Sequence, residues 1–161
     1  MSGEISYPFT IDTIQRASKS RSQAAAFSFA QPRRGAAYAQ ATGTDVPVFW
    51  DVIFRFSADD AIVFQLFFVE QLQKGLLWFT MPIRTEFGII THTCHFVASD
   101  DLMSATEEGG GIFSYKAQIM ARAQIIPDGY AEAADLIIGL PGWRNWSNLL
   151  DQTINEAMPE A

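Results

Sequence analysis

The stretch that decides the fold is VPVFWDVIFRFSADDAIVFQLFFVEQLQKGLLWFTMP, residues 46–82. In residues 46–56 every second side chain is large and apolar, a set made up of Val48, Trp50, Val52, Phe54 and Phe56. Asp51 and Arg55 fall between them and face the other way, on a side that they share with Phe49 and Ile53. A period of two with charges on one side indicates a β-strand that presents one face to a core.

The next residues predict a helix over 58–73. Ser57 is a good N-cap, Asp60 three positions later fits a capping box, and Gly75 supplies the stop. A wide apolar stripe occupies positions 62, 63, 66, 67 and 69, and the apolar surface extends beyond it at 64, 68 and 72. A helix that is apolar nearly all round is expected to lie between two layers rather than to rest on one.

An aromatic ribbon, GLLWFTMPI at residues 75–83, follows the helix. Its apolar residues point to both sides, so we expect a strand over 75–82 that is buried on both faces. Pro82 is expected to end this strand because proline cannot donate a ladder hydrogen bond. Trp78 lies on the opposite face from Phe79. We favour a place for Trp78 in an interface between copies, with burial in the chain's own core as the alternative.

Two further strands are expected at 88–98 and 112–126, separated by an acidic, glycine-ended loop at 100–111. The predicted fold class is mainly β with flanking helices (α+β). We expect an antiparallel β-sandwich or barrel with its principal helix at about 58–73, and a C-terminal helix. The chain divides into an extended, partly basic N-terminal arm at 1–44, a core domain at 45–128 and a C-terminal segment at 129–161.

The composition predicts that some apolar surface meets a partner. Apolar residues make up 48% of the 161 residues, and charged residues make up 18%, against about 25% in a typical domain. Excess apolar surface of this kind marks interaction sites. The opening MSGEISYPF lacks a signal peptide's basic region and apolar core, and the apolar runs are far shorter than the roughly 20 residues of a membrane helix. We therefore expect no membrane insertion.

The charges are split along the chain. Residues 1–44 carry five bases and two acids, a net charge of +3, whereas residues 45–161 carry six bases and sixteen acids, a net charge of −10. Arg16, Arg21, Arg33 and Arg34 in the basic part are candidate interface residues. The arm could lie on the acidic body of a neighbouring copy, bind nucleic acid, or simply be solvated. We favour a neighbouring copy over nucleic acid because the acidic body would repel phosphate.

The sequence offers little chemistry. His92, Cys94 and His95 are the clustered metal-type side chains, but on a strand His95 faces away from the other two. Three ligands therefore cannot converge from this strand alone. The paired acids suit a helix start or solvated loops, and the glycines at 109–111 lack the lysine and hydroxyl residue of a phosphate-binding loop. We predict no catalytic residue, no metal and no cofactor.

The C-terminal segment contains two tryptophans at helical spacing, Trp143 and Trp146, near a predicted helix start. Both are candidate interface residues that could anchor in the groove of a partner. The alternative is that they pack back on their own domain.

The order of these parts resembles a family of tailed-phage minor tail proteins that includes the distal-tail and tube-like ring components. The resemblance is carried by the strand VFWDVIFRFS, the capped helix ADDAIVFQLFFVEQL, the glycine and strand of GLLWFTMP, and the alternating strand IFSYKAQIMARAQII. It covers about residues 46–127, roughly half of the chain. It implies a β-sandwich or barrel with one flanking helix, a ring around the tail channel that is commonly a hexamer, and no enzyme activity.

On this resemblance the expected function is a non-enzymatic structural part of a bacteriophage tail, located in the virion and assembled in the host cytoplasm. Its expected partners are copies of itself and adjacent tail proteins, with DNA only passing through the channel. One alternative is a small-ligand-binding β-barrel protein, which would be a monomer with an aromatic pocket. Another is a different phage connector or tail-completion protein.

Overall fold

A computed structural model describes residues 4–15, 19–140, 142 and 144–145. The chain divides into two compact units, Met1–Ile125 and Ile126–Ala161, and each is described by itself. The predicted division into segments 1–44, 45–128 and 129–161 stays a prediction.

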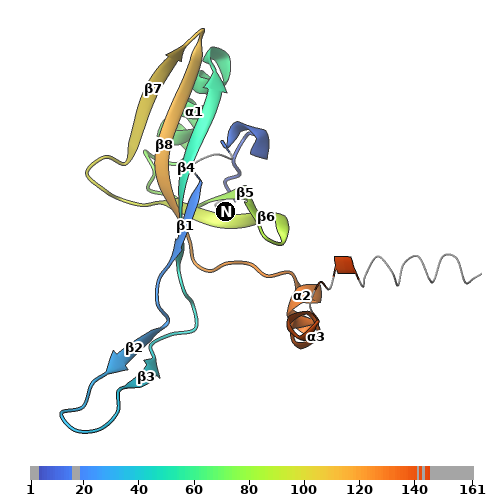
Figure 1. The fold of residues 1–161 in the computed structure, drawn as a ribbon. Helices are drawn as coiled ribbons and strands as arrows, with labels where there is room; N and C mark the ends of the chain where they lie inside the picture. The colour runs from blue at the N-terminus through green and yellow to red at the C-terminus, as the bar shows by residue number, and fades with distance from the viewer. Residues whose placement is uncertain (1–3, 16–18, 141, 143, 146–161) are drawn as a thin grey trace, which may run out of the picture. The chain divides into compact units, whose positions relative to one another are not determined.

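The first unit is built on one branched antiparallel sheet (Figure 1). Its strands are β1 (Ser20–Gln23), β4 (Val48–Ser57), β5 (Phe79–Thr85), β6 (Gly88–Phe96), β7 (Met103–Gly109) and β8 (Ile112–Ala121). The order is β1-β4-β8-β6-β5, and β7 pairs with β8 beside this path. β2 (Phe27–Ala30) and β3 (Tyr38–Ala41) form a separate two-stranded sheet. The mainly β, antiparallel fold predicted from the sequence is confirmed.

β4 and β8 form the centre of the sheet and pair along their whole lengths, from Val48 opposite Ala121 to Ser57 opposite Ile112. Every apolar residue at the even positions of β4 is buried, as the period of two predicts. The odd positions are exposed or half-buried. The second edge of β8 is shared, because β7 pairs with its first half and β6 with its last three residues.

A helix follows β4 directly, as predicted, in two parts. α1 (Ala58–Leu66) is N-capped by Ser57, whose hydroxyl accepts a hydrogen bond from the Asp60 backbone N–H at 3.4 Å. A π-helical turn, Phe67–Gln71, continues it, and the left-handed Gly75 (φ +90°) closes the segment. The inner face buries Ala61, Phe64 and Phe67. The outer face remains exposed, so the expectation that this helix lies between two layers is wrong for the part of the chain described.

The aromatic ribbon begins and ends later than predicted. Residues 73–75 all have positive φ and the Leu77 N–H bonds back to the Leu72 carbonyl, so β5 starts only at Phe79. Pro82 does not end the strand, which runs to Thr85. Both backbone groups of Thr80 bond outward to residues 5 and 7. Pro82, two positions on, faces the same way, so its missing N–H costs no bond to β6.

The sheet curls far enough for side chains at its two ends to touch, since Arg21 of β1 pairs with Glu86, the residue that follows β5. Residues 5–7 hydrogen-bond to Thr80 of β5, and the Gln15 N–H bonds to the Ile53 carbonyl of β4 at 2.8 Å. The segment between them buries Tyr7 and Ile14 in the core. The first part of the predicted arm is therefore a strap across the open side of the sheet. A sandwich or barrel stays a prediction, and the curl favours the barrel.

The acidic segment 100–111 is not a loop as predicted. Residues 103–109 form the edge strand β7, and three consecutive glycines with φ between +65° and +84° make the turn into β8. Six of the seven residues of β7 are exposed. A strand so exposed has no apolar alternation, which is why the sequence pattern does not reveal it.

In the described residues up to 140, the second unit has the short helices α2 (Asp128–Glu132) and α3 (Ala134–Gly139). α3 ends at Gly139. Leu136 and Ile138 of α3 are exposed. The C-terminal helix predicted from about residue 146 lies outside the described residues. Within the part of the chain that the structure describes, no helix is both long and apolar enough to cross a membrane.

Candidate assembly surfaces

The first candidate surface is one face of the β2–β3 hairpin. Phe27 stands opposite Ala41 and Phe29 opposite Ala39, so these four side chains share one face. The two phenylalanine rings meet edge to face at 5.4 Å between centroids, yet they are 48% and 67% exposed. The other face carries Ser28, Ala30, Tyr38 and Gln40. The hairpin therefore has a wholly apolar side that the described part of its own chain does not cover.

Two arginines lie in the connection between β2 and β3. Arg33 and Arg34 are both exposed, and Gly35 beside them has a left-handed backbone (φ +110°) that permits the turn. Asp45 is the first acid after Asp12 in the sequence. The hairpin thus combines an apolar face with a positively charged tip. The placement of Arg33 and Arg34 is compatible with an interface, and their role in one stays a prediction.

The second candidate surface is the outer face of α1 and its π-helical continuation. Ile62, Val63, Leu66 and Val69 lie at helical spacing on this face, and each is 39–61% exposed. Asp59 and Glu70 are exposed at the two ends of the same stripe. Contiguous exposed apolar side chains with a polar border mark interaction sites on soluble proteins. The sequence pattern shows these residues as apolar but does not show that they are uncovered.

Trp78 is half-buried just before β5. Its ring lies 5.0 Å from the His95 ring, and the Arg122 guanidinium lies over it at 4.9 Å. Trp78 and Arg122 also border a hollow of about 470 Å³ with His92, Thr93 and Ile125. These contacts come from its own chain, and the place of Trp78 in an interface stays a prediction.

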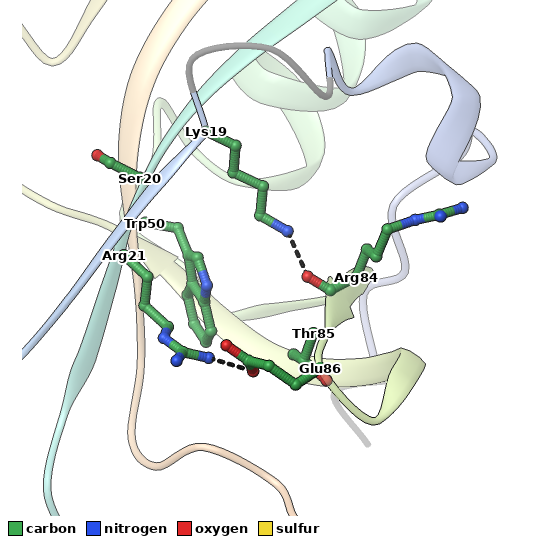
Figure 2. Close-up of a pocket in the computed structure, with 7 residues that line it drawn as sticks. All are labelled: Lys19, Ser20, Arg21, Trp50, Arg84, Thr85 and Glu86. Atoms are coloured by element: carbon green, nitrogen blue, oxygen red, sulfur yellow. Dashed lines mark hydrogen bonds and ion pairs between the residues drawn. The ribbon is translucent and has the colours of Figure 1, made fainter. Parts of the chain in front are cut away.

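A cationic hollow of about 420 Å³ lies where β1 meets the end of β5 (Figure 2). Arg21 and Glu86 form an ion pair with 2.7 Å between Nη1 and Oε2, and Lys19 Nζ donates to the Arg84 carbonyl oxygen at 2.7 Å. Figure 2 shows the Arg84 side chain pointing away from the Arg21–Glu86 pair. Arg21, an expected interface residue, is thus engaged within its own chain at the seam of the curled sheet.

Charge and burial at this seam shift two pKa values. Burial, reinforced by the neighbouring Arg84 and Arg21, lowers the pKa of Lys19. The hydrogen bond from Arg21 holds the pKa of Glu86 below its ordinary value. The seam therefore keeps its ion pair across neutral pH. Because Glu86 is mostly exposed, this pair contributes little to stability.

His92 is buried and fully hydrogen-bonded. Its Nδ1 lies 2.9 Å from the Ile90 carbonyl oxygen, and the Ile125 N–H points at its Nε2 at 3.3 Å. A neutral ring that donates from Nδ1 and accepts at Nε2 satisfies both contacts. Burial is the main cause that lowers the pKa of His92, which agrees with this neutral form. His92 thus fits the core as a structural side chain.

The other two members of the cluster do not join His92 in a metal site. Cys94 is buried on the same face, and burial raises the pKa of its thiol to about 12. His95 faces the other way and contacts the carbonyl oxygens of Leu76 and Phe96. Among the described residues no group of three or more His, Cys, Asp and Glu side chains could hold a metal ion.

Arg16, Trp143 and Trp146, the other predicted interface residues, lie outside the described residues.

No family model matches the chain, and no curated protein matches it significantly. A chain of a solved structure described as the tail of an empty GTA particle with C6 symmetry is similar over 66% of this chain and 77% of its own length. The identity is 12% and the TM-score is 0.44. A TM-score this low does not establish a common fold, so the likeness stands as a partial resemblance.

Proposed function

We propose that this chain is a structural, non-enzymatic component of a bacteriophage tail. In this proposal six copies associate into a ring at the distal tail or along the tail channel, and the ring binds neighbouring tail proteins. The protein then belongs to the virion and is assembled in the host cytoplasm, with DNA only passing through the channel. The motif order over residues 46–127 supplies the tail setting of the proposal.

The observation that carries the self-association is the β2–β3 hairpin. A two-stranded hairpin is marginally stable in water by itself. This one exposes Phe27, Phe29, Ala39 and Ala41 on a single face. A second chain that covers this face would remove the apolar side chains from water, at about 25 cal/mol for each Å². The hairpin thus has the composition of an arm that gains order from a partner.

The experiment is to locate the protein in phage particles. Particles from cells that encode the chain are purified, and the chain is detected by mass spectrometry and by antibody labelling in electron micrographs. We expect the label on tails, with a copy number that is a multiple of six. Particles whose tails are complete without the chain would contradict the tail role. A monomeric protein that binds a small apolar ligand in a saturable way would favour the ligand-binding β-barrel instead.

A further inference from the structure

The β2–β3 hairpin and the outer face of α1 lie at opposite ends of the same strand. β1, which leads into the hairpin, pairs with residues 48–51 at the start of β4. α1 begins after Ser57 at the other end. Ten residues of strand separate the two ends by roughly 30 Å.

The backbone directs the hairpin away from its own α1. The pairing of β1 with β4 continues past Gln23, because the Ala24 N–H bonds to the Pro47 carbonyl. The pairing of β2 with β3 then begins at the bond from the Thr42 N–H to the Ala26 carbonyl. Both bonds lie beyond the start of β4, on the side opposite to α1. The hairpin therefore extends from the Val48 end of β4, in the direction opposite to the helix of its own chain.

The two surfaces are complementary in chemistry. The hairpin offers an apolar face with the cations Arg33 and Arg34 at its tip, and it contains no acid. The helix offers an apolar stripe, Ile62 to Val69, with Asp59 and Glu70 at its ends. The stripe is about 10 Å long at 1.5 Å per residue. The spacing of Phe27 and Phe29, two residues apart on a strand at about 7 Å, fits within it.

We propose that the β2–β3 hairpin of one copy docks on the outer face of α1 in the next copy, with Phe27 and Phe29 against Leu66 and its neighbours. This inference rests on the self-association in the proposed function and specifies its geometry. Each copy then gives its hairpin to one neighbour and its helix to another. Such a head-to-tail contact is heterologous, and repeated copies of it close into a ring or continue as a filament.

Pairwise cysteine cross-linking of the full chain tests the contact. Phe29→Cys and Leu66→Cys are co-expressed, purified and oxidised mildly, and each is also oxidised alone. Tyr38→Cys, on the other face of the hairpin, replaces Phe29→Cys in a matched control. The native Cys94 is buried, and the wild-type chain measures its background. All three substituted positions are exposed, so circular dichroism should show each variant folded.

We expect a mixed disulfide between the Phe29→Cys chain and the Leu66→Cys chain, at least roughly tenfold more abundant than in the Tyr38→Cys control. Either variant alone should give only the wild-type background. A dominant dimer in the Phe29→Cys sample alone would mean that hairpins meet hairpins and would overturn the inference. Oligomers that form without the mixed disulfide would overturn the docking geometry while the proposed function stands. A wild-type chain that is monomeric at all concentrations would remove both.

Discussion

The two faces of α1 predict opposite effects from two neighbouring truncations, Phe64→Ala and Leu66→Ala. Phe64 is fully buried, and its ring centroid lies 4.8 Å from Phe56, 5.0 Å from Tyr115 and 5.3 Å from Phe54. Removing a buried phenylalanine costs about 3–5 kcal/mol of the free energy of unfolding. Leu66 is 57% exposed, so its truncation should cost about 1 kcal/mol or less.

Association should respond in the reverse order. Leu66→Ala removes apolar contact area from the proposed interface and should weaken self-association by roughly tenfold or more. Folded Phe64→Ala should retain more of the association than Leu66→Ala does. Urea unfolding at low protein concentration gives the stability, free of the contribution from association. Sedimentation velocity over a concentration series gives the association constant. If Leu66→Ala destabilises the chain as much as Phe64→Ala and leaves association unchanged, the outer face is packed by its own chain and the reasoning fails.

The contacts of His92, Arg21 and Trp78 each lead to a further prediction. Burial lowers the pKa of His92, so the stability from its neutral ring is present above the unfolded pKa of about 6.5. This stability falls as the pH drops below that value, by at most about 1.4 kcal/mol per pH unit. Urea titrations at pH 7.5 and 5.5 should show a smaller fall in the free energy of unfolding for His92→Gln than for wild type, and an equal fall would assign the loss to other groups. Arg21→Ala should lower the free energy of unfolding by less than about 1 kcal/mol, because its pair with Glu86 is largely exposed. A loss above about 2 kcal/mol in denaturant unfolding would show that the contact between Arg21 and Glu86 is needed to hold the two ends of the sheet together. Trp78→Ala should lower the free energy of unfolding by about 1–2 kcal/mol, because its ring is half-buried under Arg122. A fully buried tryptophan would cost roughly 3–5 kcal/mol. Unfolding and sedimentation of the variant check this, and a loss of that larger size with intact association would place Trp78 in the core.

The parts of the fold that the sequence predicts well are those with strong local patterns. β4 carries a buried apolar side chain at every second position over its whole length, and α1 has a capping serine before it and a glycine after its continuation. These features act within one strand or one helix. A pattern in the sequence can therefore locate them without knowledge of their neighbours.

The parts that the sequence misses depend on distant partners. β7 is almost wholly exposed, and pairing with β8 rather than its own composition makes it a strand. Pro82 lies inside β5 because its nitrogen faces away from β6, toward the edge where residues 5–7 bond to Thr80. Residues 4–15 belong to the predicted arm, but the rings of Tyr7 and Phe54 pack together in the core.

The candidate site divides in the same way. The exposure of Phe27 and Phe29 cannot be predicted from two aromatic residues in an alanine-rich segment, since the same pattern fits a strand of the main sheet. The sequence indicates the basic charge of the hairpin, including Arg33 and Arg34. It gives no sign that Arg21 would be paired with Glu86, which is 65 residues away.

The mass of the assembled protein tests the central claim most directly. Native mass spectrometry of the purified full chain, at concentrations from below one to above one hundred micromolar, separates the oligomers by mass. The account predicts a dominant species of six times the chain mass of 17.9 kDa, whose abundance falls in Leu66→Ala. A single 17.9 kDa monomer at every concentration, in wild type and variant alike, would contradict it.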